Sequence, residues 1–402
     1  MDTVSIEAVS SLDTIPEAVW NGLANPGWSV GEGGTATKIN EDAGAYNPFV
    51  THQFLKALED SGCVSRRTGW SPRHLLVRDD GGTPIAAAPA YLKSHSQGEY
   101  VFDYGWADAF ERAGGRYYPK VQTSVPFTPA QGPRLLVGDT DQTARRQLLA
   151  RSLVALAEES NASSVHVTFT EEADFDALLG AGYLARNDTQ FHFLNRGYTT
   201  TEDFLAALAS RKRKQIKRER REALANDISI RWVRGKDLSE ADWDAFYSFY
   251  MDTGARKWGR PYLNREFFSL LGEQLGDSVC LFMADRGGRP VAGALNLIGS
   301  ETLFGRYWGC MEDHPFLHFE VCYYQAIDFA IAHGLSRVEA GAQGEHKLAR
   351  GYEATPTRSA HFLRHAGLHD AVANYLEGER RAVERQNTVL NTYAPFKKAN
   401  DN

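Results

Sequence analysis

Alternating apolar and polar residues predict two similar β-hairpins, one in each half of the chain. Residues 73–78 and 84–92 are the first pair of expected strands, joined by a Gly-Gly turn,. Residues 278–284 and 290–299 repeat the pattern around a second Gly-Gly turn, 206 positions later. A hairpin that recurs with the same turn is the first sign of an internal repeat.

The elements expected after each hairpin also recur in one order. Each half continues with a third strand, an amphipathic helix, a short strand and a closing strand. The expected bounds are 100–104, 145–159, 163–169 and 189–194 in the first half, and 302–308, 318–333, 336–340 and 357–363 in the second. Antiparallel strands followed by a helix and a further strand predict an α/β fold with mixed sheets.

Two further blocks indicate a duplication. Pro48 and Pro261 each open an expected helix, 213 residues apart,. Gly182-Tyr183 and Gly351-Tyr352 each precede a His-Phe-Leu strand, with an offset of 169. Three blocks in the same order predict two diverged copies of one domain. We therefore expect a first domain at residues 1–198 and a second domain at residues 199–402.

The overall charge excludes a generic nucleic-acid binder. The 402 residues carry a net charge of −7 at pH 7, with a pI near 6.0,. The first residues lack the basic and apolar regions of a signal peptide, and no apolar stretch is long enough to cross a bilayer. The four cysteines have neither metal-site nor disulfide spacing,. We expect a cytoplasmic protein with reduced thiols and no membrane span.

A local cationic run contrasts with this acidic background. Residues 211–222 contain eight basic and two acidic residues, and flanking apolar residues at helical spacing predict a packed helix with a cationic face,. Guanidinium and ammonium groups on one face suit contacts with RNA or nucleotide phosphates. A solvated surface helix is the alternative. The candidate phosphate-binding residues are Arg211, Lys212, Arg213, Lys214, Lys217 and Arg218.

Aromatic residues beside cations at expected strand ends indicate a substrate cleft. Lys257 and Trp258 precede a helix of the second half, and Arg306, Tyr307 and Trp308 end a strand. Such groups bind a substrate through stacking and charge, although core packing with extended cationic side chains produces the same pattern. Asp103 and Trp106 hold the matching position in the first half, so we include both as candidate substrate-binding residues.

The segment from Glu339 to Tyr352 combines glycines with polar side chains. Glycines allow close backbone approach, and exposed N–H groups stabilise an oxyanion. Glu339, His346 and Lys347 are the candidate catalytic residues, with His346 or Glu339 accepting a proton from an amine,. Gln343, Arg350 and the nearby Glu320 complete the substrate-binding set. Glu320 with His314 and His318 lacks metal-site spacing, so we expect no metal.

Several of these blocks together resemble one family. Tyr46 to His52, Lys257 to Tyr262, Gly305 to Cys310, Leu317 to Gln325 and Gly341 to Tyr352 are similar to FemAB-like predicted N-acyltransferases, labelled peptidoglycan-biosynthesis or GNAT-family proteins. The resemblance covers about residues 45–380. It implies two tandem GNAT-like domains of the acyl-CoA N-acyltransferase type, in agreement with the repeat. The related Fem enzymes move an amino acid from aminoacyl-tRNA to an amine, and a basic stretch opens their second domain.

Two departures from the related enzymes affect the expected donor. The long helical hairpin of some Fem enzymes has no room between residues 203 and 228. The pyrophosphate loop of acetyl-CoA enzymes, Arg/Gln-x-x-Gly-x-Gly/Ala, is found in neither half, which disfavours acyl-CoA.

We therefore expect an N-acyltransferase that uses aminoacyl-tRNA and needs no cofactor. The acceptor would be an amine-bearing small molecule or a cell-wall precursor. An acyl-CoA-dependent N-acetyltransferase of a small metabolite is the first alternative, and a non-catalytic RNA- or nucleotide-binding protein is the second.

Overall fold

The computed structural model describes residues 4–257, 261–341 and 344–397. The chain forms two compact units. Unit 1 comprises residues 1–31, 36–188 and 357–384, and unit 2 comprises residues 32–35, 189–356 and 385–402. The expected division at residues 198 and 199 stays a prediction.

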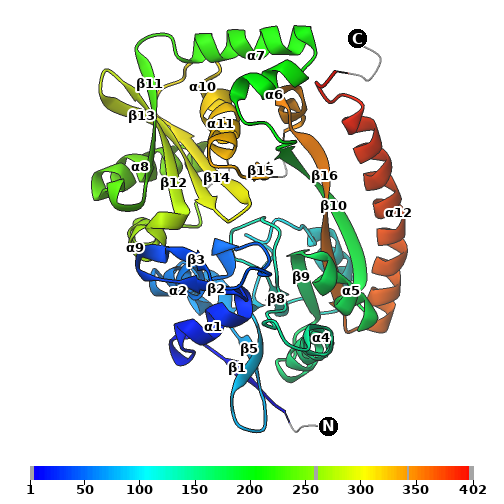
Figure 1. Ribbon diagram of the computed structural model, residues 1–402. Helices are drawn as coiled ribbons and strands as arrows, with labels where there is room; N and C mark the ends of the chain where they lie inside the picture. The colour runs from blue at the N-terminus through cyan, green and yellow to red at the C-terminus, as the bar shows by residue number, and fades with distance from the viewer. Residues whose placement is uncertain (1–3, 258–260, 342–343, 398–402) are drawn as a thin grey trace. The chain divides into compact units, whose positions relative to one another are not determined.

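Unit 1 contains a mixed sheet with a helix on its apolar face. Its strands are β4 (Trp70–Pro72), β7 (Ala90–Lys93), β8 (Lys120–Thr123), β9 (Ser164–Thr170) and the part of β16 (Glu353–Leu363) after residue 356. β8 and β9 are parallel, and the other neighbouring pairs are antiparallel. Leu92, Val121 and Val165 alternate with polar residues and pack in one core with α4 (Gln142–Glu159), which lies beside β9 in Figure 1,.

The remaining elements of unit 1 surround this sheet. A second sheet has the order β1 (Ser5–Val9), β5 (His74–Arg78) and β6 (Pro84–Ala88), and β2 (Trp28–Val30) pairs with β3 (Ala36–Lys38). The helices are α1 (Glu17–Ala24), α2 (His52–Asp60), α3 (Tyr104–Arg112), α5 (Glu172–Gly180) and α12 (Ala366–Asn391), of which α12 extends beyond unit 1.

Unit 2 contains a sheet covered on both faces. Its strands are β11 (Ile228–Arg234), β12 (Val279–Arg286), β13 (Arg289–Ile298), β14 (Thr302–Cys310), β15 (Arg337–Glu339) and the part of β10 (Leu184–Leu194) after residue 188. Phe282 packs on Phe329 of α11 (Gln325–Ala332), with ring centroids 5.6 Å apart. The next residue, Met283, points to the face covered by α8 (Glu240–Lys257), as alternation along a strand requires,.

Further helical segments of unit 2 include α6 (Thr201–Ala207), α7 (Ser210–Ala223), α9 (Arg265–Leu275), α10 (Leu317–Phe319), the π-turn η7 (Glu320–Tyr324) and the 3₁₀ segment η8 (Glu345–Arg350). Of these, α7, η7 and η8 carry candidate residues. In Figure 1, α7 lies beside α6.

The closing strands pair in an order that the repeat did not predict. The sequence placed 189–194 at the end of the first half and 357–363 at the end of the second. Instead, His192 of β10 pairs with Glu339 of β15, and His361 of β16 pairs with His166 of β9. Each unit therefore takes its last strand from the other half of the sequence.

The prediction of a strand at residues 100–104 is wrong. Asp103 precedes helix α3, and the third strand of this region is β8 instead. Trp106 and Phe110 lie four residues apart and join one apolar cluster, so a helical period describes this stretch better than an alternating one,. The expected strand at 84–92 is divided between β6 and β7, whereas the hairpin of β12 and β13 is confirmed.

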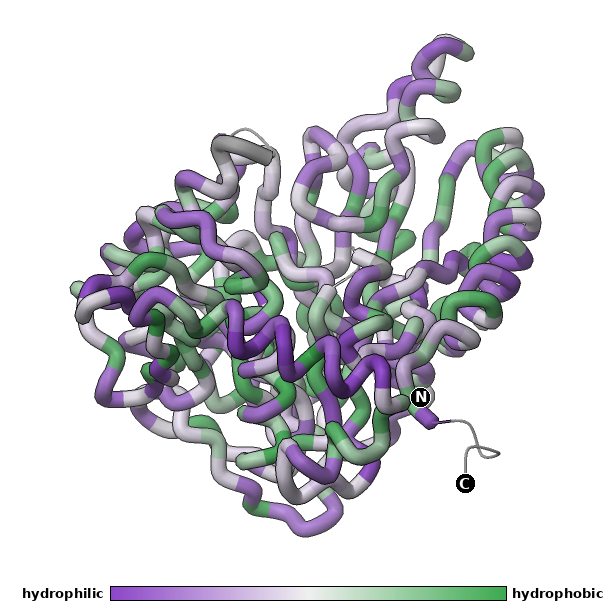
Figure 2. Tube along the Cα trace, turned by 90° about the horizontal axis from the view of Figure 1, so that it is seen from above, coloured by the Kyte–Doolittle hydropathy of each residue, from purple (hydrophilic) through white to green (hydrophobic). Residues whose placement is uncertain are grey.

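Hydrophilic and hydrophobic residues are interleaved along the helices (Figure 2). Among the described residues, no helix is long and apolar enough to cross a membrane.

Candidate functional site

Helix α7 carries a cationic face. The preceding helix α6 begins with a capping box, in which Thr200 and Asp203 each accept a hydrogen bond from the other's backbone N–H,. Leu208 has extended backbone angles and separates α6 from α7, so the expected apolar stripe is interrupted. Of the candidate phosphate-binding residues, four are exposed and two are half-buried: Arg211, Lys214, Lys217 and Arg218, then Lys212 and Arg213.

The opposite face of α7 is held by a buried ion pair. Glu219 is 2% exposed and Arg350 of η8 is 5% exposed. Arg350 Nη2 lies 2.9 Å from Glu219 Oε2, and Nε of the same guanidinium donates to that oxygen at 3.2 Å. The Tyr324 hydroxyl donates to Oε2 at 2.5 Å. These contacts join the basic helix to the segment with the candidate catalytic residues.

A second ion pair joins α7 to the π-turn. Arg220 Nη2 lies 2.9 Å from Glu320 Oε1 and 2.6 Å from Asp328 Oδ2. Burial raises the pKa of Glu320, although Arg220 counteracts that effect. π-turns are rare and concentrate at functional sites. The turn that presents Glu320 therefore positions the inner face of α7, and Glu320 serves this contact in the structure.

Lys347 and His346 follow one another on η8 but have different surroundings. Lys347 is 3% exposed, and its Nζ donates to the carbonyl oxygens of Ala340 at 2.5 Å and Gly341 at 3.1 Å. Burial lowers the pKa of this ammonium to about 8. His346 is exposed and lies 3.0 Å from the Tyr323 hydroxyl through Nε2. Partial burial of the ring, together with Arg350 and Lys347, lowers the pKa of His346. One residue is thus a cationic donor, and its neighbour favours the neutral imidazole.

The aromatic candidates of β14 approach the same region. The Trp308 ring centroid lies 5.2 Å from that of His318, which lies 6.3 Å from that of His346. Tyr307 packs against Tyr250, and the Arg306 guanidinium lies 5.2 Å from the Tyr307 ring centroid. The structure therefore brings Trp308 close to the candidate catalytic segment through His318.

The other candidates of unit 2 lie on β15, at the end of α8 or outside the described residues. Glu339 is buried at the end of β15, with Oε1 3.8 Å from Arg337 Nε. Lys257 ends α8. Trp258 and Gln343 lie outside the described residues.

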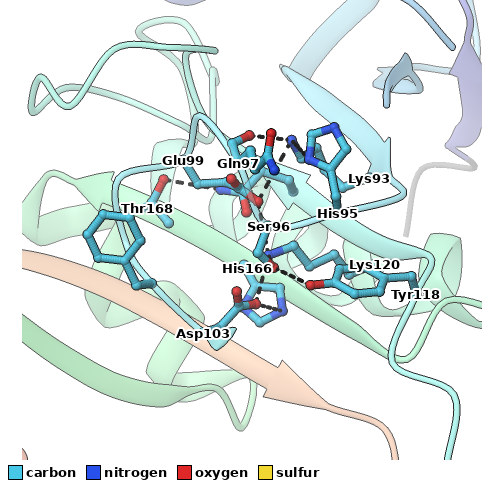
Figure 3. A network of polar contacts seen from close by, with 12 residues as sticks. Lys93, His95, Ser96, Gln97, Glu99, Asp103, Tyr118, Lys120, His166 and Thr168 are labelled. Carbon is cyan, nitrogen blue, oxygen red and sulfur yellow. Dashed lines mark hydrogen bonds and ion pairs between the residues drawn. The ribbon is translucent and has the colours of Figure 1, made fainter. Parts of the chain in front are cut away.

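Asp103 belongs to a separate polar network in unit 1 (Figure 3). Lys120 Nζ donates to Asp103 Oδ2 at 2.7 Å, and Tyr117 donates to the same oxygen at 2.7 Å. Burial opposes ionisation of Asp103, but Lys120 outweighs it and keeps the pKa of the carboxyl well below its ordinary value. Trp106 packs edge-on against His361, with centroids 5.0 Å apart. Asp103 is therefore a buried carboxylate at the centre of a hydrogen-bonded group.

Known proteins match this chain in family and in fold. The FemAB-like family, described as peptidoglycan biosynthesis/recognition, matches residues 11–398. The chain belongs to the FemAB-like family. The crystal structure of FemX, at 11% identity, has a TM-score of 0.50 and covers 89% of this chain and 98% of its own. No curated protein matches in sequence.

Two other solved structures match this chain with TM-scores below 0.50. The C-terminal domain of a putative lysylphosphatidylglycerol synthetase from Agrobacterium fabrum has a TM-score of 0.49 at 11% identity, covering 79% of this chain and 94% of its own. A tandem GNAT protein from the clavulanic acid pathway has a TM-score of 0.44 at 11% identity, covering 90% and 98%.

Family membership and the FemX-like fold confirm two expectations. The protein has GNAT-like mixed α/β folds, and it is an N-acyltransferase of the FemAB-like type connected with peptidoglycan biosynthesis. The roles of single residues stay predictions.

The buried polar residues of unit 1 in this FemAB-like protein were not predicted from the sequence. Lys93, Lys120, His166 and His361 are each 2% exposed or less. The alternation in residues 165–170 was visible, but alternation normally indicates a strand with one solvated face. The burial of these two lysines and two histidines is evident only in the structure, and such residues are rarely buried without partners,.

Proposed function

We propose that this FemAB-like protein transfers an aminoacyl group from aminoacyl-tRNA to a primary amine, in the cytoplasm. The acceptor is an amine-bearing cell-wall precursor. The observation that carries the proposal is the anchored basic helix: α7 presents exposed cations outward, while Glu219 and Arg220 fix its inner face to η8 and η7. A fixed row of cations matches a polyanionic donor.

The arrangement of charges on α7 favours tRNA over a small diphosphate. Arg211, Lys214, Lys217 and Arg218 are exposed over two turns, and like charges at this spacing repel one another,. Only Arg218 among these four has an ion pair within the described residues, with Glu222 at 3.7 Å. Several phosphates spread along a backbone neutralise such a row better than one diphosphate.

In the proposed reaction, the amine nitrogen bonds to the ester carbonyl carbon and forms a tetrahedral oxyanion. The carbon–oxygen bond to the ribose then breaks, and the ribose oxygen leaves with a proton. Lys347 supplies the positive N–H donor for the developing negative charge. His346, or alternatively Glu339, accepts the proton that the amine loses. No covalent intermediate with the enzyme is required, since positioning and charge stabilisation suffice.

The test is tRNA binding as a function of salt. We replace Arg211, Lys214 and Arg218 with Gln and titrate tRNA by filter binding. Each phosphate contact contributes roughly 0.7 to 0.9 log units of affinity per tenfold change in salt, so the slope of log affinity against log salt should be shallower by roughly 2.1 to 2.7 in the variant. The matched control replaces three exposed cations outside α7, Arg66, Arg67 and Arg289, and should keep the slope. Equal slopes in all three proteins, or no binding by the wild type, would remove tRNA as the donor.

A further inference from the structure

The ring of His346 is held by three contacts within unit 2, although the residue is exposed. A Cβ on Gly344, whose φ is +103°, would lie 2.4 Å from His346 Cε1, so the ring occupies the space that a side chain at residue 344 would need. The Phe319 ring centroid lies 5.3 Å from that of His346. The third contact is a hydrogen bond, in which the Tyr323 hydroxyl lies 3.0 Å from Nε2. These contacts fix the orientation of an imidazole that solvent can reach.

Tyr323 is positioned for this hydrogen bond. Its side chain is buried, with 5% exposure, on the π-turn η7. Within the described part of the chain, the hydrogen-bond partner of its hydroxyl is His346 Nε2. The backbone of Tyr323 is fixed separately, because the Tyr352 hydroxyl donates to its carbonyl oxygen at 3.2 Å. Burial raises the pKa of the Tyr323 phenol, so Tyr323 meets His346 as a neutral hydroxyl.

This hydrogen bond decides which nitrogen of His346 can exchange a proton with a substrate. Tyr323 occupies Nε2, so Nδ1 is the nitrogen left for an amine. In the neutral ring either partner of the Tyr323 contact can donate. In the imidazolium both nitrogens carry hydrogen, so Nε2 must donate and the Tyr323 oxygen must accept. A hydrogen bond from a charged donor is roughly twice as strong as a neutral one, so proton uptake at Nδ1 strengthens the contact.

The charges around His346 oppose its protonation. Partial burial has the largest effect, and the cations of Arg350 and Lys347 on the same segment η8 lower its pKa further. His318 of α10 also faces the ring, with centroids 6.3 Å apart. The neutral imidazole is therefore available at pH 7, but the imidazolium that a proton acceptor must form is disfavoured. A neutral hydroxyl that accepts from Nε2 offsets this cost without adding a charge.

We propose that Tyr323 is a positioning residue, which holds His346 through Nε2 so that Nδ1 accepts the proton of the attacking amine. The inference rests on the proposed function, and it selects His346 over Glu339 as the proton acceptor. As the nitrogen–carbon bond forms, the amine N–H bond breaks, a bond from hydrogen to Nδ1 forms, and the Tyr323 hydroxyl keeps its own proton. The neutral ring must therefore carry its hydrogen on Nε2 and donate it to Tyr323.

Nuclear magnetic resonance of the full-length protein with ¹⁵N-labelled histidine tests the contact without a substrate. The His346 signals are assigned by their loss in His346→Asn. In the neutral ring, Nε2 should resonate as a nitrogen that carries hydrogen, and Nδ1 as one that does not. Tyr323→Phe removes only the hydroxyl, so the pKa of His346 should fall by about one unit, the effect of losing one hydrogen bond to a charged group. Hydrogen on Nδ1 of the neutral ring, or an unchanged pKa in Tyr323→Phe, overturns the proposal.

Initial rates of transfer connect the contact with the reaction. Tyr323→Phe should lower kcat about tenfold with little change in KM, because the contact strengthens only as the proton is taken up. Tyr183→Phe is the matched control, since it removes the hydrogen bond of another buried hydroxyl, to the Ala150 carbonyl oxygen at 2.9 Å in unit 1. It should keep both kcat and the pKa of His346.

The outcomes separate this inference from the proposed function. Equal losses of kcat in Tyr323→Phe and Tyr183→Phe would make the role of Tyr323 merely structural and contradict the inference. Transfer that proceeds unchanged in Tyr323→Phe would remove this inference alone. Absence of transfer from charged tRNA, with the resonance results as expected, would remove the proposed function and leave the contact between Tyr323 and His346 in place.

Discussion

The Glu219 carboxylate of α7 and the Arg350 guanidinium of η8 form a buried pair that connects the cationic helix with the candidate catalytic segment. The guanidinium is also stacked on Phe319, with its carbon 3.5 Å from the ring centroid, and it donates to the His346 carbonyl oxygen at 2.7 Å. Arg350 therefore fixes the backbone at His346 while it holds α7.

Glu219→Gln should destabilise the protein strongly. The change leaves the Arg350 charge buried without its counter-charge, and breaking a buried pair in this way costs about 3 kcal/mol or more. Glu222→Gln on the same helix is exposed and should change stability by less than about 0.5 kcal/mol,. Urea denaturation followed by circular dichroism measures both. Similar small losses in the two variants would show that the pair contributes little.

Transfer activity should decline as the pH rises through about 8. Burial lowers the pKa of Lys347 to about 8, so the ammonium is present below that pH and lost above it. Lys347→Arg keeps its charge at high pH, so this alkaline decline should disappear even if the rate is lower. Lys347→Met should reduce kcat by about 10² to 10³. Initial rates of transfer, measured from pH 6 to 10 for the wild type and both variants, test this prediction. The same alkaline decline in wild type and Lys347→Arg would assign it to another group.

The free energy of unfolding should rise with pH where transfer activity declines, because both depend on the protonation of Lys347. The folded pKa of Lys347 lies below the ordinary lysine value of 10.5, so the folded state loses its proton first. The cost of burying the charge is therefore present below about pH 8 and is relieved between about pH 8 and 10.5. Relative to Lys347→Met, the wild type should gain stability across that range. Parallel stability curves for the two proteins, measured by denaturation at each pH, would contradict the burial of a charged amine.

Gly309→Ala should destabilise the strand that carries Arg306 to Trp308. A Cβ at Gly309 would lie 2.1 Å from the Phe249 carbonyl oxygen of α8, which is a backbone atom and cannot rotate away. We expect a loss of about 1–3 kcal/mol. Gly378 of α12 has no neighbour within 4 Å of its added Cβ, so Gly378→Ala should be neutral or stabilising by up to about 1 kcal/mol,. Thermal unfolding compares the two, and an unchanged Tm in Gly309→Ala would exclude the tight contact.

The repeat and its spacing predicted much of the fold, because hairpins and helix caps depend on local sequence. β12 with β13 forms the expected hairpin, and the cap of α6 by Thr200 and Asp203 uses residues three positions apart. Strand partners depend on long-range packing instead. The order of elements along the chain is the same whether β16 pairs with a strand of the second half of the sequence or with β9 of the first half. The sequence alone therefore did not reveal that β16 pairs with β9.

The sequence predicted candidate-site residues only where charged residues or glycines were clustered. The basic helix and the segment after Glu339 were visible in the sequence, whereas the inward role of Glu219 was not. Glu219 lies among eight basic residues, and only its burial against Arg350 and Tyr324 distinguishes it from a solvated acid. His166 and His361 are 195 residues apart, so their contact depends entirely on strand pairing.

The most direct test of the account is a transfer assay with two competing donors. Purified protein is incubated with tRNA charged with a radiolabelled amino acid, or with labelled acyl-CoA, and with small amines and cell-wall precursor peptides as acceptors. We predict a labelled amide product from charged tRNA that is reduced at least tenfold in the Arg211, Lys214 and Arg218 triple variant and retained in the Arg66, Arg67 and Arg289 control. Acylation of the same amines from acyl-CoA, with no transfer from charged tRNA, would contradict the account.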